Sequence, residues 1–265
     1  MTYCVGMLLD QGLVMASDSR TNAGLDHIST FRKMWVWERP GDRVIVMLTA
    51  GNLAITQAVA NLLAEGVEAE NGDKGETLHT VPSMFAAARL VGAAVREIRR
   101  MDAEALAAAD TDFNATMILG GQIAGRAMRL FQIYAAGNFI EATGDTPFFQ
   151  IGETKYGKPI LDRVLNHETA LDDAVKLALV SMDSTLRSNI SAGPPIDLLT
   201  YLRDSGEVAI QVRIDEDDAY FNELRRRWSE NLKRAFDDLP PPPYGPKGAG
   251  GGKVSSRPTP MPTAR

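Results

Sequence analysis

The sequence contains little cysteine and no long hydrophobic run. Its 265 residues include a single cysteine, Cys4, so an internal disulfide is excluded. No apolar run approaches the roughly 20 residues that a membrane-spanning helix needs, and no charged leader followed by a hydrophobic segment is present. These absences predict a cytoplasmic protein that makes no contact with membranes.

Histidine is also scarce, and it does not occur in catalytic or metal-binding patterns. His27, His79 and His167 lie in polar, loop-like contexts, which we interpret as solvated loops. The sequence has no H-x-x-H pair, C-x-x-C motif or P-loop, so we expect no metal and no cofactor. The formal net charge of −6 argues against nucleic acid as a partner, because binding phosphates needs a concentrated basic surface.

Strands dominate the first fifty residues. Apolar runs at 2–9 and 13–17 predict a hairpin across Asp10-Gln11-Gly12, with Gly12 at the positive φ of a bulged turn. Residues 33–38 and 43–50 form a second strand pair around a Pro-Gly-Asp turn, because they are rich in Val, Ile and Trp. Four strands are therefore expected before the first helix.

Along the rest of the chain, segments with helical periodicity alternate with segments that predict strands. Helices are predicted at 52–65, 84–98, 160–165, 169–186 and from 215 onward, and strands at 115–119, 128–134, 148–151, 196–202 and 208–214. The helix at 169–186 is expected to start with a capping box at Thr169. Helix pairs between antiparallel hairpins predict an α+β fold, a four-layer αββα sandwich of two antiparallel sheets, because each sheet needs both faces covered.

One domain is expected over residues 1–239, because no linker or repeat divides the interior. Residues 240–265 are rich in proline and glycine and contain no acidic residue, so they are predicted to form a disordered tail.

An N-terminal threonine offers hydrolytic chemistry without histidine. Thr2 directly precedes the first strand, and removal of Met1 would expose its α-amine, whose ordinary pKa of about 7.7–8.0 suits a general base. Asp18 ends the return strand of the first hairpin, and Lys33 opens the next strand. A lysine beside that carboxylate would lower the proton affinity of the Thr2 hydroxyl. Gly51 follows the fourth strand, where its N–H could face an oxyanion.

These stretches, "GLVMASDSR", "FRKMWVWE" and "MLTAGNLA" after Thr2, resemble the N-terminal half of proteasome β-type subunits, which have the N-terminal-nucleophile hydrolase fold. The start "MTYCVGM" and the long C-terminal extension resemble the bacterial Anbu subfamily. The resemblance implies roles for several residues. Thr2 would be nucleophile and base, Asp18 and Lys33 the polarising pair, Arg20 a structural support, Gly51 the oxyanion donor, and Thr21, Asn22 and Thr49 substrate-binding residues.

The sequence departs from the proteasomal pattern in two places. Lys33 comes one residue earlier than in most proteasomal β subunits. The supporting Ser-Asp-Ser trio of the family corresponds to Glu153, Ser188 and Ser191, of which only Ser191 keeps its residue type. Loss of the aspartate predicts peptidase activity that is slow, narrow in substrate range or conditional.

The leading hypothesis is a threonine-type peptidase that cleaves peptide or amide bonds by acyl transfer. The resemblance implies a homo-oligomer, either a ring or an open helical assembly, that acts on peptides or unfolded proteins, with an unfoldase whose identity stays open. Two alternatives remain. The chain could be a catalytically weak or inactive assembly subunit, or an amidase that acts on a small molecule.

Overall fold

A computed structural model describes residues 2–22, 28–66 and 76–243. The chain divides into two compact units, residues 1–226 and 227–265. Helix α5 (Ala219–Asp237) begins in the first unit and continues into the second. The first unit contains all the sheets, and the layers described below belong to it. Most of the predicted tail lies outside the described residues.

Two five-stranded antiparallel sheets form the centre of this unit. The first sheet has the order β10 (Phe148–Gly152), β1 (Tyr3–Leu8), β2 (Gly12–Asp18), β11 (Ile196–Leu202), β12 (Val208–Ile214). The second has the order β5 (Met34–Arg39), β6 (Arg43–Gly51), β7 (Ala115–Ile123), β8 (Arg129–Ile133), β9 (Phe139–Glu141). A separate two-stranded sheet pairs β3 (Arg20–Asn22) with β4 (Ile28–Thr30).

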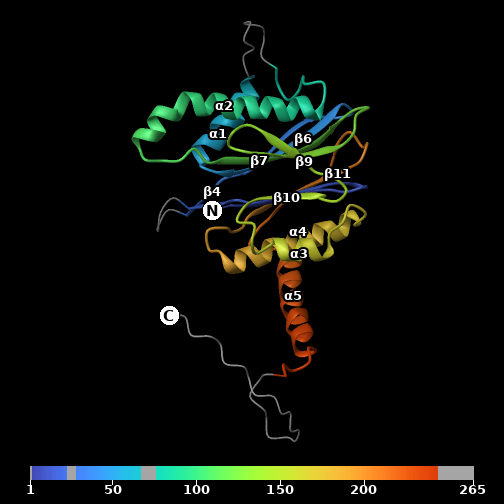
Figure 1. Cartoon of the computed structure of the whole chain (residues 1–265). Helices are drawn as coiled ribbons and strands as arrows, with labels where there is room; N and C mark the ends of the chain where they lie inside the picture. The colour runs from blue at the N-terminus through green and yellow to red at the C-terminus, as the bar shows by residue number, and fades with distance from the viewer. Residues whose placement is uncertain (1, 23–27, 67–75, 244–265) are drawn as a thin grey trace, which may run out of the picture. The chain divides into compact units, whose positions relative to one another are not determined.

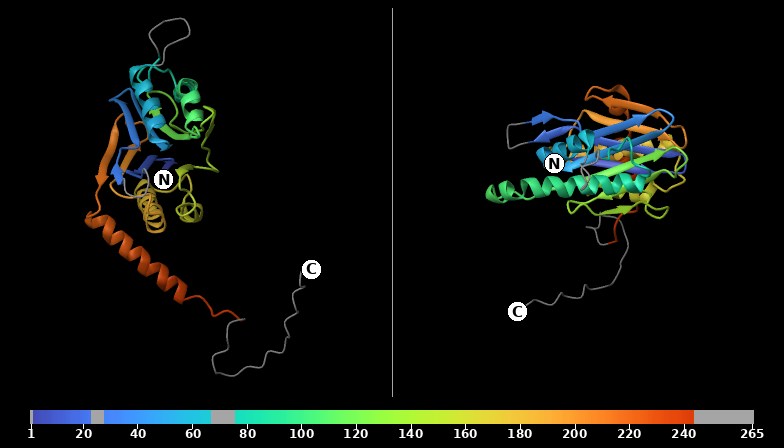
Figure 2. Two further views of the ribbon diagram at one scale, coloured as in Figure 1. Left: turned by 90° about the vertical axis from the view of Figure 1, so that its left-hand side faces the viewer. Right: turned by 90° about the horizontal axis from the view of Figure 1, so that it is seen from above.

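Helices cover the outer face of each sheet (Figure 1). The four helices of these layers are α1 (Leu53–Glu65), α2 (Met84–Ala108), α3 (Lys158–Val164) and α4 (Leu171–Ser188). The pair α1 and α2 packs on the sheet of β5–β9, and α2 runs along that sheet in the view from above in Figure 2. The pair α3 and α4 packs on the other sheet. The predicted αββα sandwich is therefore confirmed.

Three apolar cores separate these four layers, one under each helix pair and one between the sheets. Because the sheets are covered on both sides, their central strands are apolar on both faces. In β1, Tyr3 and Val5 face α3 and α4, whereas Cys4 faces the other sheet. The run of apolar residues that predicted this strand is therefore a consequence of its position in the middle of the sandwich.

Three local expectations were wrong. Gly12 does not adopt a positive φ; instead, a side chain there would overlap the carbonyl oxygen of Tyr201 on the neighbouring strand. Helix α4 has Ala170 as its N-cap and no side-chain cap, because the Thr169 hydroxyl donates to Asn166 Oδ1 at 3.2 Å. Three short strands, β3, β4 and β9, were not predicted, since each has only three residues.

Strand β12 alternates as predicted but lies at a sheet edge. Ile210 and Val212 are exposed, whereas Ile214 is buried. A register shift between Thr200 and Tyr201 interrupts the pairing of β11 with β12. The apolar alternation therefore predicted the strand correctly, although one face of the strand is not fully buried.

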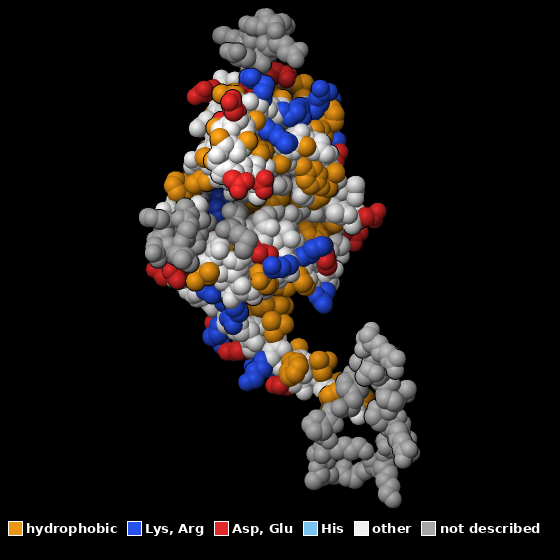
Figure 3. All heavy atoms as spheres, turned by 60° about the vertical axis from the view of Figure 1, so that its left-hand side comes forward, with side chains coloured by type: hydrophobic (Ala, Val, Ile, Leu, Met, Phe, Trp, Pro, Cys, Tyr) orange, Lys and Arg blue, Asp and Glu red, His pale blue; other side chains and the backbone are white. Residues whose placement is uncertain are grey.

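The surface carries mixed charge on the face shown in Figure 3, where Lys and Arg side chains lie among Asp and Glu side chains. None of the helices in residues 2–22, 28–66 and 76–243 combines the length and hydrophobicity that crossing a bilayer requires.

Candidate active site

Thr2 is held by backbone contacts at the end of a sheet strand. It lies directly before β1 and is only 9% exposed. Its carbonyl oxygen accepts a hydrogen bond from the Glu153 N–H at 2.7 Å. Tyr3 pairs with Gly152 of β10, so the chain is already in the sheet one residue after Thr2. This fixes the backbone of the predicted nucleophile.

Asp18 is the fully buried end of β2, and three separate segments donate hydrogen bonds to its carboxylate. The Tyr3 N–H donates to Oδ1 at 3.0 Å, Lys33 Nζ donates to the same oxygen at 2.7 Å, and the Gly193 N–H donates to Oδ2 at 3.1 Å. Because the Tyr3 N–H belongs to the peptide bond that follows Thr2, Asp18 lies directly beside the backbone of the predicted nucleophile. The predicted convergence of Asp18 and Lys33 is confirmed.

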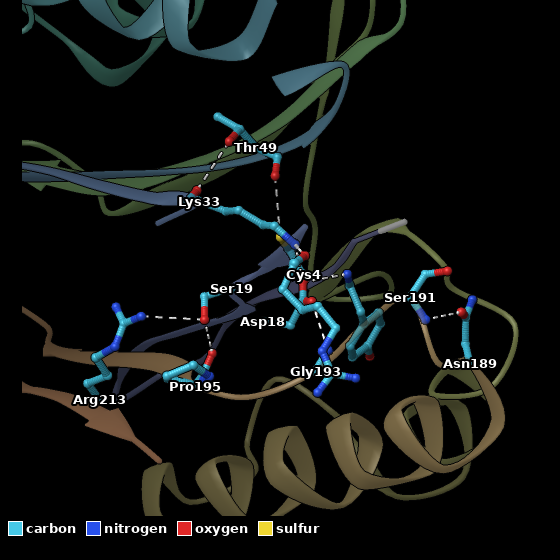
Figure 4. Close-up of polar contacts among 12 residues, drawn as sticks. Cys4, Asp18, Ser19, Lys33, Thr49, Asn189, Ser191, Gly193, Pro195 and Arg213 are labelled. Atoms are coloured by element: carbon cyan, nitrogen blue, oxygen red, sulfur yellow. Dashed lines mark hydrogen bonds and ion pairs between the residues drawn. The ribbon is translucent and has the colours of Figure 1, made fainter. Parts of the chain in front are cut away.

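Lys33 is 4% exposed, although it carries a charge. Its ammonium group donates to Asp18 and also to the Arg20 carbonyl oxygen at 2.6 Å. In Figure 4 its side chain extends from the start of β5 toward Asp18, so that the pair bridges the two sheets. Burial raises the pKa of the Asp18 carboxyl, and the Lys33 ammonium and the backbone donors oppose that rise.

Thr49 holds the backbone of Lys33. The Thr49 N–H donates to the Lys33 carbonyl oxygen at 2.9 Å, and the Thr49 hydroxyl lies 3.4 Å from the same oxygen. The Thr49 side chain is buried. Its carbonyl oxygen accepts from Cys4 Sγ at 3.6 Å, which places the end of β6 over the start of β1. The structure thus places Thr49 behind Lys33, whereas the sequence prediction placed it beside the substrate.

Arg20 supports the loop that contacts Asp18. Its guanidinium donates to the Ile190 carbonyl oxygen at 3.1 Å. A side chain at Gly193 would overlap that guanidinium, so the end of the Arg20 side chain would have to move to admit one. The Gly193 carbonyl oxygen in turn accepts from the N–H groups of Ser19 and Arg20. Through these contacts Arg20 holds the loop from which Gly193 donates to Asp18.

Gly51 and the short β3 strand lie around this centre. Gly51 ends β6 with φ of 116°, and a side chain there would overlap the Asn114 carbonyl oxygen. It is exposed, and Asn52 follows it as the N-cap of α1. Thr21 and Asn22 lie in β3, paired on one edge with β4. The Asn22 side chain falls outside the described residues.

The predicted supporting trio is only partly brought together. Glu153 is buried beside Thr2, whereas Ser188 is exposed at the end of α4. The next residue, Asn189, is buried, and its Nδ2 donates to Glu153 Oε2 at 3.1 Å. Its Oδ1 accepts from the Ser191 N–H at 2.9 Å. At the end of α4 it is therefore Asn189, and not Ser188, that bonds to Glu153.

The arrangement offers acid–base and electrostatic chemistry from side chains and backbone. Over residues 2–22, 28–66 and 76–243, no group of three or more His, Cys, Asp or Glu side chains is placed to hold a metal ion. The Asp18–Lys33 pair is bonded to the peptide N–H that follows Thr2, and the Glu153 backbone N–H is bonded to the Thr2 carbonyl oxygen.

Comparison with known proteins matches this geometry to one family. A model of proteasome subunits matches residues 2–200. The chain belongs to the proteasome subunit family. Among curated members, it is 25% identical over 225 residues to a proteasome subunit beta from Archaeoglobus profundus, a match that covers 85% of this chain and 94% of that protein.

Solved structures of this family give higher identities. Anbu from a Hyphomicrobium strain is 53% identical, with a TM-score of 0.82 over 90% of this chain and 98% of that one. A helical assembly of the Anbu complex from Pseudomonas aeruginosa is 51% identical, with a TM-score of 0.85 over 91% of this chain and 98% of that one. The resemblance to proteasome subunits, and to Anbu among them, is therefore confirmed.

Proposed function

We propose that this proteasome-family subunit is a threonine-type N-terminal-nucleophile peptidase that acts through Thr2 after removal of Met1. The observation that carries the proposal is the buried Lys33–Asp18 pair, which is bonded to the peptide N–H that follows Thr2. A buried ion pair contributes little to stability on its own, because desolvation offsets its attraction. Its place beside an N-terminal threonine supports a catalytic role.

In this mechanism the Thr2 hydroxyl proton passes to the α-amine of the same residue, and Oγ1 attacks the carbonyl carbon of the scissile bond. The Lys33 ammonium stabilises the developing negative charge on Oγ1, and Asp18 holds that ammonium in place. The N–H of Gly51 donates to the oxyanion. The protonated amine then transfers its proton to the leaving nitrogen, and water hydrolyses the Thr2 ester.

An extended peptide would bind along the free edge of β3. Among residues 2–22, 28–66 and 76–243, Thr21 and Asn22 pair only with β4, so a peptide strand could pair with the backbone of the other side. A peptide or unfolded segment is therefore the substrate class that we propose. A cytoplasmic location stays a prediction from the sequence.

The decisive variants for this function are Thr2→Ala and Thr2→Ser. Turnover of a fluorogenic peptide library should disappear with Thr2→Ala and persist with Thr2→Ser, because serine keeps a hydroxyl beside the same amine. Full turnover by Thr2→Ala would overturn the proposal. Exposed Thr111→Ala provides a matched control that should keep wild-type turnover.

A second candidate function is a homo-oligomeric assembly subunit with weak or no peptidase activity. It is favoured by the similarity to a chain solved as a helical assembly and by the sequence prediction that Ser188 replaces the family's supporting aspartate. Sedimentation velocity would detect the assembly, and Thr2→Ala should assemble like the wild type under both candidate functions. The peptide library then separates the two.

A further inference from the structure

We propose that the Glu153 carboxylate is the ionic partner of the Thr2 α-ammonium group in the chain that lacks Met1, and that it sets the pH at which this amine can act as a base. The inference rests on the proposed function in that it requires Thr2 to be the first residue. It assigns to Glu153 a positioning role that acts through the amine.

The backbone places Glu153 opposite Thr2. Tyr3 pairs with Gly152 across β1 and β10, so the next residues, Thr2 and Glu153, face each other at the end of the ladder. The Glu153 N–H donates to the Thr2 carbonyl oxygen at 2.7 Å. At Gly152, φ is 83°, and a side chain there would overlap the same carbonyl. The end of β10 therefore lies directly against Thr2.

The Glu153 carboxylate is buried with an incomplete set of partners. The residue is 8% exposed, and among residues 2–22, 28–66 and 76–243 the only charged partner of its Oε1 is Lys155 Nζ, at 3.5 Å, from a side chain that is 67% exposed. Such an exposed lysine compensates a buried charge poorly, because solvent screens it. Buried carboxylates are normally paired with a buried donor or cation. An ammonium group created at Thr2 would supply that missing partner.

Asn189 orients this carboxylate without neutralising it. Its Oδ1 accepts from the Ser191 N–H at 2.9 Å, which directs Nδ2 to Glu153 Oε2. An amide donates a hydrogen bond but brings no positive charge. An aspartate at this position would repel Glu153. The pair of Glu153 with Asn189 therefore keeps one negative charge, on a residue whose backbone N–H bonds to Thr2.

The other charged groups around Thr2 are largely occupied. Asp18 and Lys33 form an ion pair, and the Arg20 guanidinium is bound to the carbonyl oxygen of Ile190. Lys155 lies at the surface. A carboxylate close to an ammonium stabilises the charged form, which raises the pKa of the amine. The free-base form needed for catalysis would then accumulate at more alkaline pH than for an unperturbed terminus.

The test measures the amine directly. The full chain is released from an N-terminal fusion so that it begins at Thr2, and acetylation of its α-amine by trace acetic anhydride is followed by peptide mass spectrometry across pH 6–10, since only the free amine reacts. We expect Glu153→Gln to lower the amine pKa by about one unit or more. Glu207→Gln, an exposed carboxylate at the opposite end of the sheet, should leave it unchanged. Equal titration of Glu153→Gln and the wild type would overturn the inference.

Two further variants separate charge from structure. Glu153→Asp returns the charge and should restore at least half of the difference between Glu153→Gln and the wild type, whereas a titration equal to that of Glu153→Gln would contradict an ionic effect. Thr2→Ala keeps the α-amine but has no nucleophile, so it should show the same dependence on Glu153. The titration therefore reports on the ion pair even if peptide turnover proves not to need Thr2.

Discussion

The two carboxylates beside Thr2 differ in how completely they are bonded. Asp18 accepts three hydrogen bonds, one of them from the buried ammonium of Lys33. Glu153 accepts one from a neutral amide and lies 3.5 Å from an exposed lysine. The Asp18 carboxylate is therefore fully bonded, whereas the Glu153 carboxylate can accept a further cation.

The proposed nucleophile needs two kinds of support, and this difference assigns one kind to each carboxylate. Asp18 fixes Lys33, and fixed charges stabilise a transition state without reorganisation. A carboxylate that acts on the α-amine must instead pair with that amine when it gains a proton and release it when it loses the proton. A carboxylate that already has all its partners could not do so. Variants of residues on the two sides test the contrast between the fully bonded Asp18 carboxylate and the incompletely bonded Glu153 carboxylate.

The largest effect is expected for Lys33→Met. It leaves the buried Asp18 charge uncompensated, which should lower the free energy of unfolding by about 3–5 kcal/mol. The measurement is urea unfolding followed by circular dichroism. Lys158→Met is the matched control, because its partner Asp162 is at the surface and such pairs contribute about 0–1 kcal/mol. Equal destabilisation by the two variants would contradict the saturated Asp18 site.

Tyr3 contacts both Asp18 and strand β10, and Tyr3→Phe tests the contribution of its phenol. The Tyr3 N–H donates to Asp18, and its phenol bonds to Ser181 and accepts from Gln150 of β10 at 2.5 Å. Burial raises the pKa of Tyr3 to about 12. Since the phenol of the unfolded chain ionises near its ordinary pKa of about 10, the contribution of Tyr3 is complete below pH 10 and is lost as the pH rises toward 12.

A shift of this size corresponds to about 3 kcal/mol, at about 1.4 kcal/mol for each pH unit. Unfolding in urea at pH 9, 10 and 11 should therefore show a free energy that falls more steeply with pH in the wild type than in Tyr3→Phe. Tyr220→Phe, which alters an exposed phenol, should keep the wild-type slope. An unchanged slope in Tyr3→Phe would show that the phenol is not protected.

Gly193→Ala should displace Arg20 from the loop that contacts Asp18. The new methyl group overlaps the Arg20 guanidinium, the end of a flexible side chain, so the expected cost is that of its hydrogen bond to Ile190, about 0.5–1.5 kcal/mol. In an Arg20→Ala background the same change should be much less destabilising, and the two changes should couple by at least about 0.5 kcal/mol. Additive effects in this double-mutant cycle would mean that Arg20 and Gly193 act independently.

A further effect is expected at the end of α4. Asn189→Ala removes the side-chain partner of the Ser191 N–H and one partner of the Glu153 carboxylate, which should destabilise the fold by about 1–3 kcal/mol at most. Ser188→Ala, one residue earlier and exposed, should stay within about 0.5 kcal/mol of the wild type. Thermal unfolding compares the two. A larger effect at Ser188 would return the supporting role to the residue that the sequence favoured.

Much of the Asp18 side could be predicted from the sequence. A hairpin brings residue 18 back to residue 2 because its two strands have nearly equal length, and the pairing of Cys4 with Ser17 confirms that register. A lysine at the start of the next predicted strand then lies within reach of that carboxylate. Local pattern and strand geometry were sufficient here, since few residues separate the partners.

The Glu153 side could not be predicted in the same way. Asn189 follows a helix whose last turn is decided by tertiary packing, so helical periodicity could not distinguish it from Ser188. A buried asparagine just beyond a helix C-terminus was the available signal. Gly12 likewise allows the close approach of β11. Because β11 lies about 190 residues away in the sequence, the local turn pattern does not reveal this contact.

The central claim is that Thr2 becomes an N-terminal nucleophile, and mass spectrometry of the N-terminal peptide after treatment with a threonine-directed covalent inhibitor tests it most directly. We predict that Met1 is absent, that the adduct lies on Thr2, and that Lys33→Met slows adduct formation at least about 100-fold, because one preorganised charge contributes about 10²–10³ to such rates. A chain that retains Met1, or an adduct that forms equally fast without Lys33, would contradict the account.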